Sequence, residues 1–302
     1  MVNVIMYHYI KDQLKEKEFP KIKGINLSQF ESQIKYLLKH NEPISIEELT
    51  QNPFNKKRNY VLFTFDDGYK EHYQPVCEIL DKYNIKGAFY IPVDSVMKNK
   101  LLDVNKIHIL LATVDESQVL KKIKFLYNRH YDSKELNNII ESIELTSRYD
   151  DPKVEIIKKL LQTLIPIEKR EFLLNELSKE FFKESDSDIA KKWYLNTDEM
   201  KQMLGAGMHI GIHGESHVRL SSLSSSEQYR EIESSINFLD KIYGDKPYTK
   251  TICYPYGDYN QETLNILDKL NVTHGFTTEP RGFCFETDLR TIPRYDTNDF
   301  QS

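Results

Sequence analysis

YVLFTFDDG, at residues 60–68, joins a run of aromatic and branched apolar residues to two adjacent carboxylates and a glycine. Such a run predicts a buried β-strand, and Thr64 is its only polar member before Asp66. Polar residues that directly follow a buried parallel strand lie at the mouth of an α/β barrel, where active sites form. The stretch therefore predicts that Asp66 and Asp67 lie together at the edge of the core. The alternative is an ordinary Asp-Asp-Gly turn.

Strands and helices alternate on both sides of this stretch. An apolar strand is expected over residues 2–9, and a helix with a capping box at Ser28 and Glu31 should follow it. Later βα units predict strands at the segments KGAFYIPV, MHIGI, TKTICYPYG, THGFTT and LRTIPRYD. Polar residues end several of these strands, which favours an α/β fold with a parallel sheet closed or nearly closed into a barrel. The alternative is an open doubly wound sheet, although no G-x-G-x-x-G follows a strand to indicate a dinucleotide site.

The segment 95–192 differs in character from the rest of the chain. It contains long charged amphipathic stretches, such as DESQVLKKIKFLYNRH, with almost no glycine and no strand alternation. We expect an inserted helical subdomain between the two parts of the barrel, residues 1–94 and 193–302. Its charge runs are best explained as solvated helix faces, although the insertion could select the substrate or mediate dimerisation.

Composition excludes several classes of partner. The chain of 302 residues carries 41 basic and 46 acidic residues, a formal net charge of −5, so it has no electrostatic basis for binding nucleic acid. No basic leader and no apolar run of roughly 18 residues is seen, which predicts a soluble, cytoplasmic protein without a transmembrane segment. The three cysteines, Cys77, Cys253 and Cys284, are widely spaced, which predicts reduced, partly buried thiols rather than a thiolate zinc site.

Two histidines four residues apart complete a candidate metal site. His213 and His217, in HGESH, would lie on one side of the chain if it turns after the strand. With Asp67 they form a set of two histidines and one carboxylate that suits Zn²⁺, or another first-row divalent ion such as Co²⁺ or Ni²⁺. Repulsion between Asp66 and Asp67 should raise one carboxyl pKa, leaving Asp66 as a base. Either motif alone would be ordinary; together they predict metal-assisted hydrolysis of an amide or ester.

Three segments, in this order, resemble a known family: TFDDG at residues 64–68, HGESH at 213–217 and YPYG at 254–257. Their order and their placement after strands are similar to those of the polysaccharide deacetylases with the NodB homology domain, also called carbohydrate esterase family 4. The resemblance implies a distorted (β/α) barrel, with Asp66 as general base and Asp67, His213 and His217 as metal ligands. It also implies that the backbone N–H of Tyr256 stabilises the oxyanion.

The chain departs from the common family pattern at two positions. The arginine that often precedes the proline segment is missing from TICYPYG, and Arg294 is the candidate replacement for orienting Asp66. The usual C-terminal Leu-x-His is also missing, since no histidine follows His274. Some members carry an N-terminal Tyr-His segment instead, which MYHYI resembles, so His8 is the candidate general acid; the alternative is a buried core histidine.

The sequence thus predicts a metal-dependent enzyme that removes an N-acetyl group from an acetamido sugar. The substrate would be a glycan or a nucleotide- or lipid-linked glycan precursor. Hydrolysis of another amide, such as an N-formyl sugar or a cyclic imide, is the enzymatic alternative. A non-catalytic glycan-binding module is the alternative from another class, and the presence of Asp66 beside the three ligands disfavours it.

Overall fold

The computed structural model describes residues 1–11, 19–51, 57–145, 151–284 and 288–299. These residues fall into two compact units. The first comprises those within Met1–Asp12, Gly24–Lys100 and Ala190–Ser302, and the second those within Gln13–Lys23 and Leu101–Ile189. The predicted insertion, 95–192, shares residues 101–189 with the second unit. Residues 95–100 and 190–192 lie instead with the first unit.

A parallel sheet organises the first unit. Its strand order is β10-β1-β5-β6-β7-β8-β9, with β4 paired to the start of β5, and every pair is parallel. From β5 to β9 the order follows the chain without a reversal, unlike a doubly wound sheet. The strands are β1 (Val2–Tyr7), β4 (Glu42–Pro43), β5 (Tyr60–Phe65), β6 (Ala88–Ile91), β7 (His209–Ile212), β8 (Thr251–Cys253), β9 (His274–Phe276) and β10 (Tyr295–Asp296).

Residues 292–296 join the two edges of this sheet. The Ile292 N–H donates to the Gly275 carbonyl in β9 at 2.7 Å, and the Ile292 carbonyl accepts from the Thr277 N–H at 2.8 Å. A few residues later, Tyr295 pairs with Ile5 of β1. The sheet therefore curls into a distorted barrel, which confirms the predicted fold class. The prediction of one strand over LRTIPRYD was wrong in part, because Leu289–Thr291 forms a 3₁₀ turn before the short β10.

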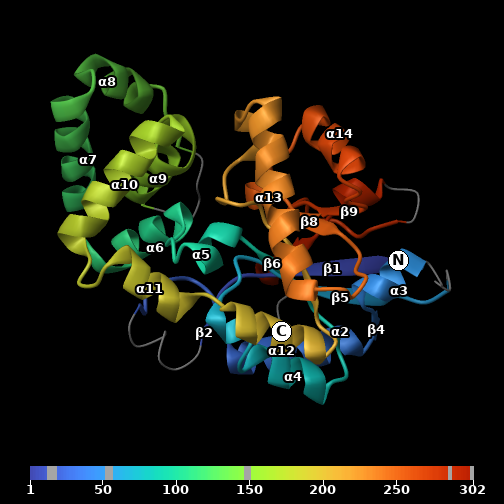
Figure 1. Cartoon of the computed structure of the whole chain (residues 1–302). Coiled ribbons are helices and arrows are strands. Elements are labelled where there is room, and N and C mark those ends of the chain that lie inside the picture. Colours follow the sequence, from blue (N-terminus) through green and yellow to red (C-terminus); the bar gives the residue numbers. More distant parts are fainter. Residues whose placement is uncertain (12–18, 52–56, 146–150, 285–287, 300–302) are drawn as a thin grey trace. The chain divides into compact units, whose positions relative to one another are not determined.

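The helices of the first unit pack around the strands (Figure 1). One predicted cap was wrong: the capping box of α2 is made by Asn26 and Gln29, not by Ser28 and Glu31. Glu31 instead accepts hydrogen bonds from Lys82 at 2.8 Å and from Tyr83. The helices are α2 (Leu27–Leu38), α3 (Ile46–Gln51), α4 (Val76–Lys82), α5 (Val93–Met97), α12 (Thr197–Gly205), α13 (Ser225–Tyr243) and α14 (Gln261–Lys269); a separate small sheet pairs β2 (Ile10–Lys11) with β3 (Ile25–Asn26).

Strand β5 is buried along its whole length, and its alternation positions the site. Phe63 and Phe65 face a core shared with the helices, where Phe65 stacks on Phe89 at 4.6 Å between ring centroids. Leu62 faces the opposite way, into a second core cluster that the neighbouring strands enclose. Because side chains alternate along a strand, Thr64 and Asp66 follow Leu62 onto that inner face. Asp66 is thereby directed toward the interior of the barrel.

The second unit is built from helices around its own apolar core. Its members in order are α6 (Asp103–Thr113), α7 (Glu116–His130), α8 (Ser133–Glu141), α9 (Pro152–Lys159), a π-helical turn (Leu160–Leu164) and α10 (Ile167–Phe181), while α11 (Asp186–Trp193) begins in this unit and ends in the first. Among the described residues of either unit, no helix has both the length and the apolar composition needed to cross a bilayer.

Candidate metal centre and active site

Asp67, His213 and His217 converge at the ends of β5 and β7. The Oδ1 atom of Asp67 lies 3.4 Å from Nε2 of His213 and 3.2 Å from Nε2 of His217. All three side chains are buried. One ligand atom from each lies within 4.8 Å of the others, which suits a single divalent ion. The structure therefore brings together the three residues that the sequence predicted as ligands.

Neighbouring groups orient two of these three side chains. Nδ1 of His213 donates to the Cys253 carbonyl at 2.7 Å, so Nε2 keeps the lone pair that a metal needs. The Tyr69 hydroxyl donates to Oδ2 of Asp67 at 2.7 Å, and Oδ1 has no hydrogen-bond partner among the described residues. A buried, unbonded carboxylate oxygen facing two imidazoles is costly unless a cation completes the set, so these residues fit a metal.

The backbone is strained at three positions of the site. In the described part of the chain, six non-glycine residues have positive φ, and three of them are asparagines, which tolerate this conformation. The other three are Asp67 (φ 71°), His217 (φ 58°) and Tyr256 (φ 59°). A left-handed conformation costs such residues roughly 1–2 kcal/mol each. Strain of this kind gathers where the surrounding structure must hold a functional geometry.

Asp66, beside the candidate metal ligands, is held in a buried ion pair. Arg294 donates from Nη1 to Oδ1 at 2.9 Å and from Nη2 to Oδ2 at 2.8 Å. Arg294 also donates to the Thr277 carbonyl and to the Thr64 hydroxyl, and only 1% of its surface is exposed. The structure thus places Arg294 where the sequence predicted a replacement for the missing arginine.

The predicted rise in one carboxyl pKa was wrong for both aspartates. Burial alone would raise the pKa of Asp66, but the Arg294 guanidinium outweighs it and holds that pKa below its ordinary range. Burial likewise acts to raise the pKa of Asp67, but the His213 and His217 imidazoles, 3.4 Å and 3.2 Å from Oδ1, hold that pKa well below the ordinary value. The prediction failed because the Arg294 guanidinium at Asp66, and the two imidazoles at Asp67, outweigh the repulsion between the two carboxylates.

His8 lies on the open side of Asp66. Its Nε2 atom is 3.8 Å from Oδ2 of Asp66, and its side chain is 40% exposed, which does not fit a buried core histidine. The His8 carbonyl accepts a hydrogen bond from Nε2 of His72 at 2.9 Å, which anchors the backbone just after β1. The imidazole therefore faces both solvent and the carboxylate, as a group that exchanges protons with a substrate must.

Tyr256 lies beside His217, one of the candidate metal ligands. Its ring centroid is 4.9 Å from that of His217, and the Arg219 guanidinium lies over the same ring at 4.6 Å. The segment Pro255–Gly257 forms a 3₁₀ turn after β8. The left-handed conformation of Tyr256 sets the direction of its backbone N–H, the group predicted to bind the oxyanion.

A second set of metal-ligand types, Asp66, His213 and Cys253, lies close together in the same region. Both oxygens of Asp66 are already engaged by Arg294, and the Cys253 thiol donates to Oδ2 of Asp66 at 3.2 Å. Burial raises the pKa of Cys253 well above that of an ordinary thiol, which disfavours the thiolate that a metal would need. The set with Asp67, His213 and His217 is therefore the better metal site.

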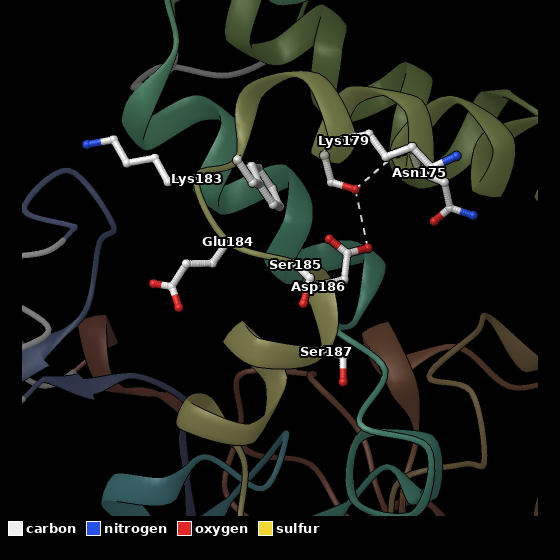
Figure 2. Close-up of a pocket in the computed structure, with 9 residues that line it drawn as sticks. Asn175, Lys179, Lys183, Glu184, Ser185, Asp186 and Ser187 are labelled. Carbon is white, nitrogen blue, oxygen red and sulfur yellow. Dashed lines mark hydrogen bonds between the residues drawn. The ribbon is translucent and has the colours of Figure 1, made fainter.

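A hollow of about 570 Å³ lies in the second unit, between the end of α10 and the start of α11 (Figure 2). Two of its polar groups already bind each other: Ser178 donates to Asp186 at 3.2 Å, and Asp186 also pairs with the buried Lys106 at 2.7 Å. Lysines and acidic residues both line it, so it has no strong charge preference. Both candidate metal-ligand sets among the described residues lie in the first unit.

Three residues of the site were missed or undervalued from the sequence. Tyr69 directly follows DDG, and Glu231 binds the HGESH loop from helix α13. Cys253 was considered only as a partly buried thiol, but it is fully buried against Asp66 and Arg294. Tyr69 could have been proposed from its place beside Asp67. No local pattern links Glu231 or Cys253 to the residues that they contact.

Comparison with known proteins gives one family. A family model described as polysaccharide deacetylase matches residues 54–122 and 172–275, together more than half of the 302 residues. A relative from Bacillus subtilis (strain 168), YxkH, named as a polysaccharide deacetylase, is 35% identical over 92 residues. That alignment covers 30% of this chain and 32% of YxkH, so the chain aligns with about a third of the length of this relative.

Solved structures show the same fold over nearly the whole chain. The Streptococcus pyogenes deacetylase PplD, in complex with acetate, covers 98% of this chain and 91% of its own, with a TM-score of 0.58 and 19% identity. IcaB from Ammonifex degensii covers 97% and 90%, with a TM-score of 0.54 and 14% identity. At such low identities the likeness establishes the fold.

Proposed function

The chain belongs to the polysaccharide deacetylase family, and we propose that it is a metal-dependent hydrolase that removes an N-acetyl group from an acetamido sugar. The observation that carries the proposal is the convergence of Asp67, His213 and His217 on one point beside the Asp66–Arg294 pair. Two histidines and one carboxylate leave coordination positions open for water and substrate and favour Zn²⁺, with Co²⁺ or Ni²⁺ as alternatives. When bound, such a cation supplies Lewis acidity toward an amide carbonyl and toward water.

The protein's own groups then divide the proton transfers between them. Asp66 takes a proton from the attacking water, because Arg294 holds the carboxylate ionised and in one orientation. His8 donates a proton to the departing amine nitrogen, because its exposed imidazole faces the same carboxylate from the open side. The Tyr256 N–H donates to the oxyanion that forms on the former carbonyl oxygen when water adds to the carbonyl carbon.

The substrate is proposed as an acetamido sugar in a glycan or in a nucleotide- or lipid-linked precursor. The family description supports a deacetylase acting on a polysaccharide. The acetate in the PplD complex is the acyl product that the same reaction would release here.

The test uses purified full-length protein, stripped of metal with a chelator and then reloaded with Zn²⁺, Co²⁺ or Ni²⁺. Released acetate is measured with chito-oligosaccharides and UDP-N-acetyl sugars, and released formate with N-formyl analogues. We expect one metal ion per chain, acetate release only from the loaded protein, and loss of both in Asp67→Ala, His213→Ala and His217→Ala. Full metal content in His217→Ala would refute the ligand assignment. Formate release without acetate release would refute the acyl group proposed.

A further inference from the structure

The loop that carries both histidines has a conformation that its own sequence does not favour. It follows β7 and turns through Gly214, with φ of 74°, before His217 adopts φ of 58°. A side-chain Cβ at position 214 would come within 3.3 Å of Oε2 of Glu231. Something outside the loop must therefore stabilise this turn, because a histidine does not prefer a left-handed conformation.

Glu231, on helix α13, contacts the middle of this loop through three hydrogen bonds. Its Oε2 atom accepts from the backbone N–H of Glu215 at 2.9 Å and of Ser216 at 3.0 Å. Its Oε1 atom accepts from the Ser216 hydroxyl at 2.6 Å. Two successive backbone N–H groups that point at one anion form a nest, a geometry that binds a carboxylate well. Hydrogen bonds to a charged acceptor are also stronger than those between neutral groups.

The other face of the loop is held by the start of α5. The Val93 N–H donates to the Gly214 carbonyl at 3.2 Å, and the Asp94 N–H donates to the Glu215 carbonyl at 2.9 Å. The carbonyl side of the turn is thus fixed by backbone N–H groups, and these bonds do not depend on the side chains at positions 93 and 94. The N–H side depends on a single side chain, that of Glu231.

We propose that Glu231 is a positioning residue for His217. Its carboxylate fills the nest of Glu215 and Ser216 and holds the loop in the conformation that directs Nε2 of His217 to within 3.2 Å of Asp67. The role in metal binding rests on the function proposed above, whereas the ordering of the loop does not. Without Glu231, His217 would relax toward ordinary backbone conformations, and the three ligands would no longer be preorganised.

The experiment compares Glu231→Gln with Glu233→Gln in the full-length protein. Glu233 lies on the same helix, but its carboxylate accepts from the Tyr229 hydroxyl instead of from the loop, so it controls for the loss of one charge. Zn²⁺ affinity is measured by competition with a chelator. Amide hydrogen exchange over residues 213–217 is measured in the metal-free protein. For Glu231→Gln we expect roughly ten- to hundredfold weaker Zn²⁺ binding and faster exchange of the loop amides. Glu233→Gln should match the wild type in both.

Wild-type Zn²⁺ affinity and wild-type exchange in Glu231→Gln would overturn the inference. If Glu231→Gln does not fold by circular dichroism, Ser216→Ala removes only the hydroxyl bond. It should show a smaller change in the same direction, and no change would also overturn the inference. A wild-type protein that binds Zn²⁺ but releases no acetate would refute the proposed function alone, because neither the affinity nor the exchange measurement depends on turnover.

Discussion

Replacing Arg294 by methionine tests the buried ion pair most directly. Methionine keeps an apolar stem of similar length but leaves the Asp66 carboxylate, 1% exposed, without the two charge-assisted hydrogen bonds of 2.9 Å and 2.8 Å. Breaking a buried pair by removing one partner typically costs about 3–5 kcal/mol, because a charge stays buried without compensation. We therefore expect the free energy of unfolding of the Arg294→Met variant to fall by that amount at pH 7.

The assay is urea unfolding of the metal-free protein, so that ligand binding does not add to stability. Fluorescence of Trp193 reports on the first unit, because it is the single tryptophan of the chain and is 3% exposed there. The matched control is Arg290→Met. Arg290 also binds two carboxylates, those of Asp268 and Asp288, but its side chain is 26% exposed, so its removal should cost at most about 1 kcal/mol.

The double variant Asp66→Asn with Arg294→Met separates charge burial from packing. If the buried charge causes the loss, removing Asp66 as well should recover part of it, and the two changes should not add. A loss below about 1 kcal/mol in Arg294→Met, no larger than in Arg290→Met, would refute the reasoning. Fully additive effects in the double variant would refute it as well.

Asp66→Asn should keep its metal while acetate release falls by at least about a hundredfold, because the base is removed and the ligands stay; loss of metal would make Asp66 a ligand. His8→Ala should keep metal and fold and lose roughly a hundredfold in turnover of an amide, with a smaller loss for an aryl acetate, whose leaving group needs no proton; an unchanged amide rate would exclude His8 as the acid. Tyr69→Phe should weaken Zn²⁺ binding by roughly tenfold or more in a chelator competition, and equal affinity would show that Asp67 needs no such partner. Burial lowers the pKa of His274 from its ordinary 6.5 to about 4, so the unfolded chain takes up a proton at a higher pH than the folded chain does. The free energy of unfolding, measured by urea titrations, should therefore fall by about 3 kcal/mol as the pH drops from 6.5 toward 4. His274→Gln should flatten that pH dependence, and an unchanged slope would assign it to other groups.

Local sequence determined the elements that carry the site. The run of apolar residues over Tyr60–Phe65 forms a buried strand with the predicted bounds, because a continuous apolar run and β-propensity act within a few residues. Asp66 and Asp67 directly follow it, and HGESH directly follows β7, so covalent connection alone carries these groups to the same end of the parallel sheet. The resemblance to the polysaccharide deacetylases rested on these same short motifs.

At the start of helix α2, the local sequence pattern predicted the wrong capping residues. The pattern at Ser28 and Glu31 predicted a capping box, but Asn26 and Gln29 form it, since the helix begins before the residue that the pattern indicated. Glu31 is engaged by Lys82 and Tyr83, from α4 and the residue after it, contacts that only the folded chain brings near. Propensity sets that a helix forms here, and the neighbouring Asn26–Gln29 pair, rather than the pattern at Ser28 and Glu31, caps its first turn.

The state of the carboxylates was decided by tertiary structure alone. The distance along the chain from Asp66 to Arg294 is 228 residues, and no spacing rule links them. The same holds for Glu231 and the HGESH loop, which meet because α13 packs beside β7. Residues of a sequence motif supply the kinds of chemical group at a site. The pKa, the orientation and the strain of those groups depend on charges and hydrogen-bond donors that arrive from distant segments, because electrostatic interactions in a buried site act through space and not along the chain.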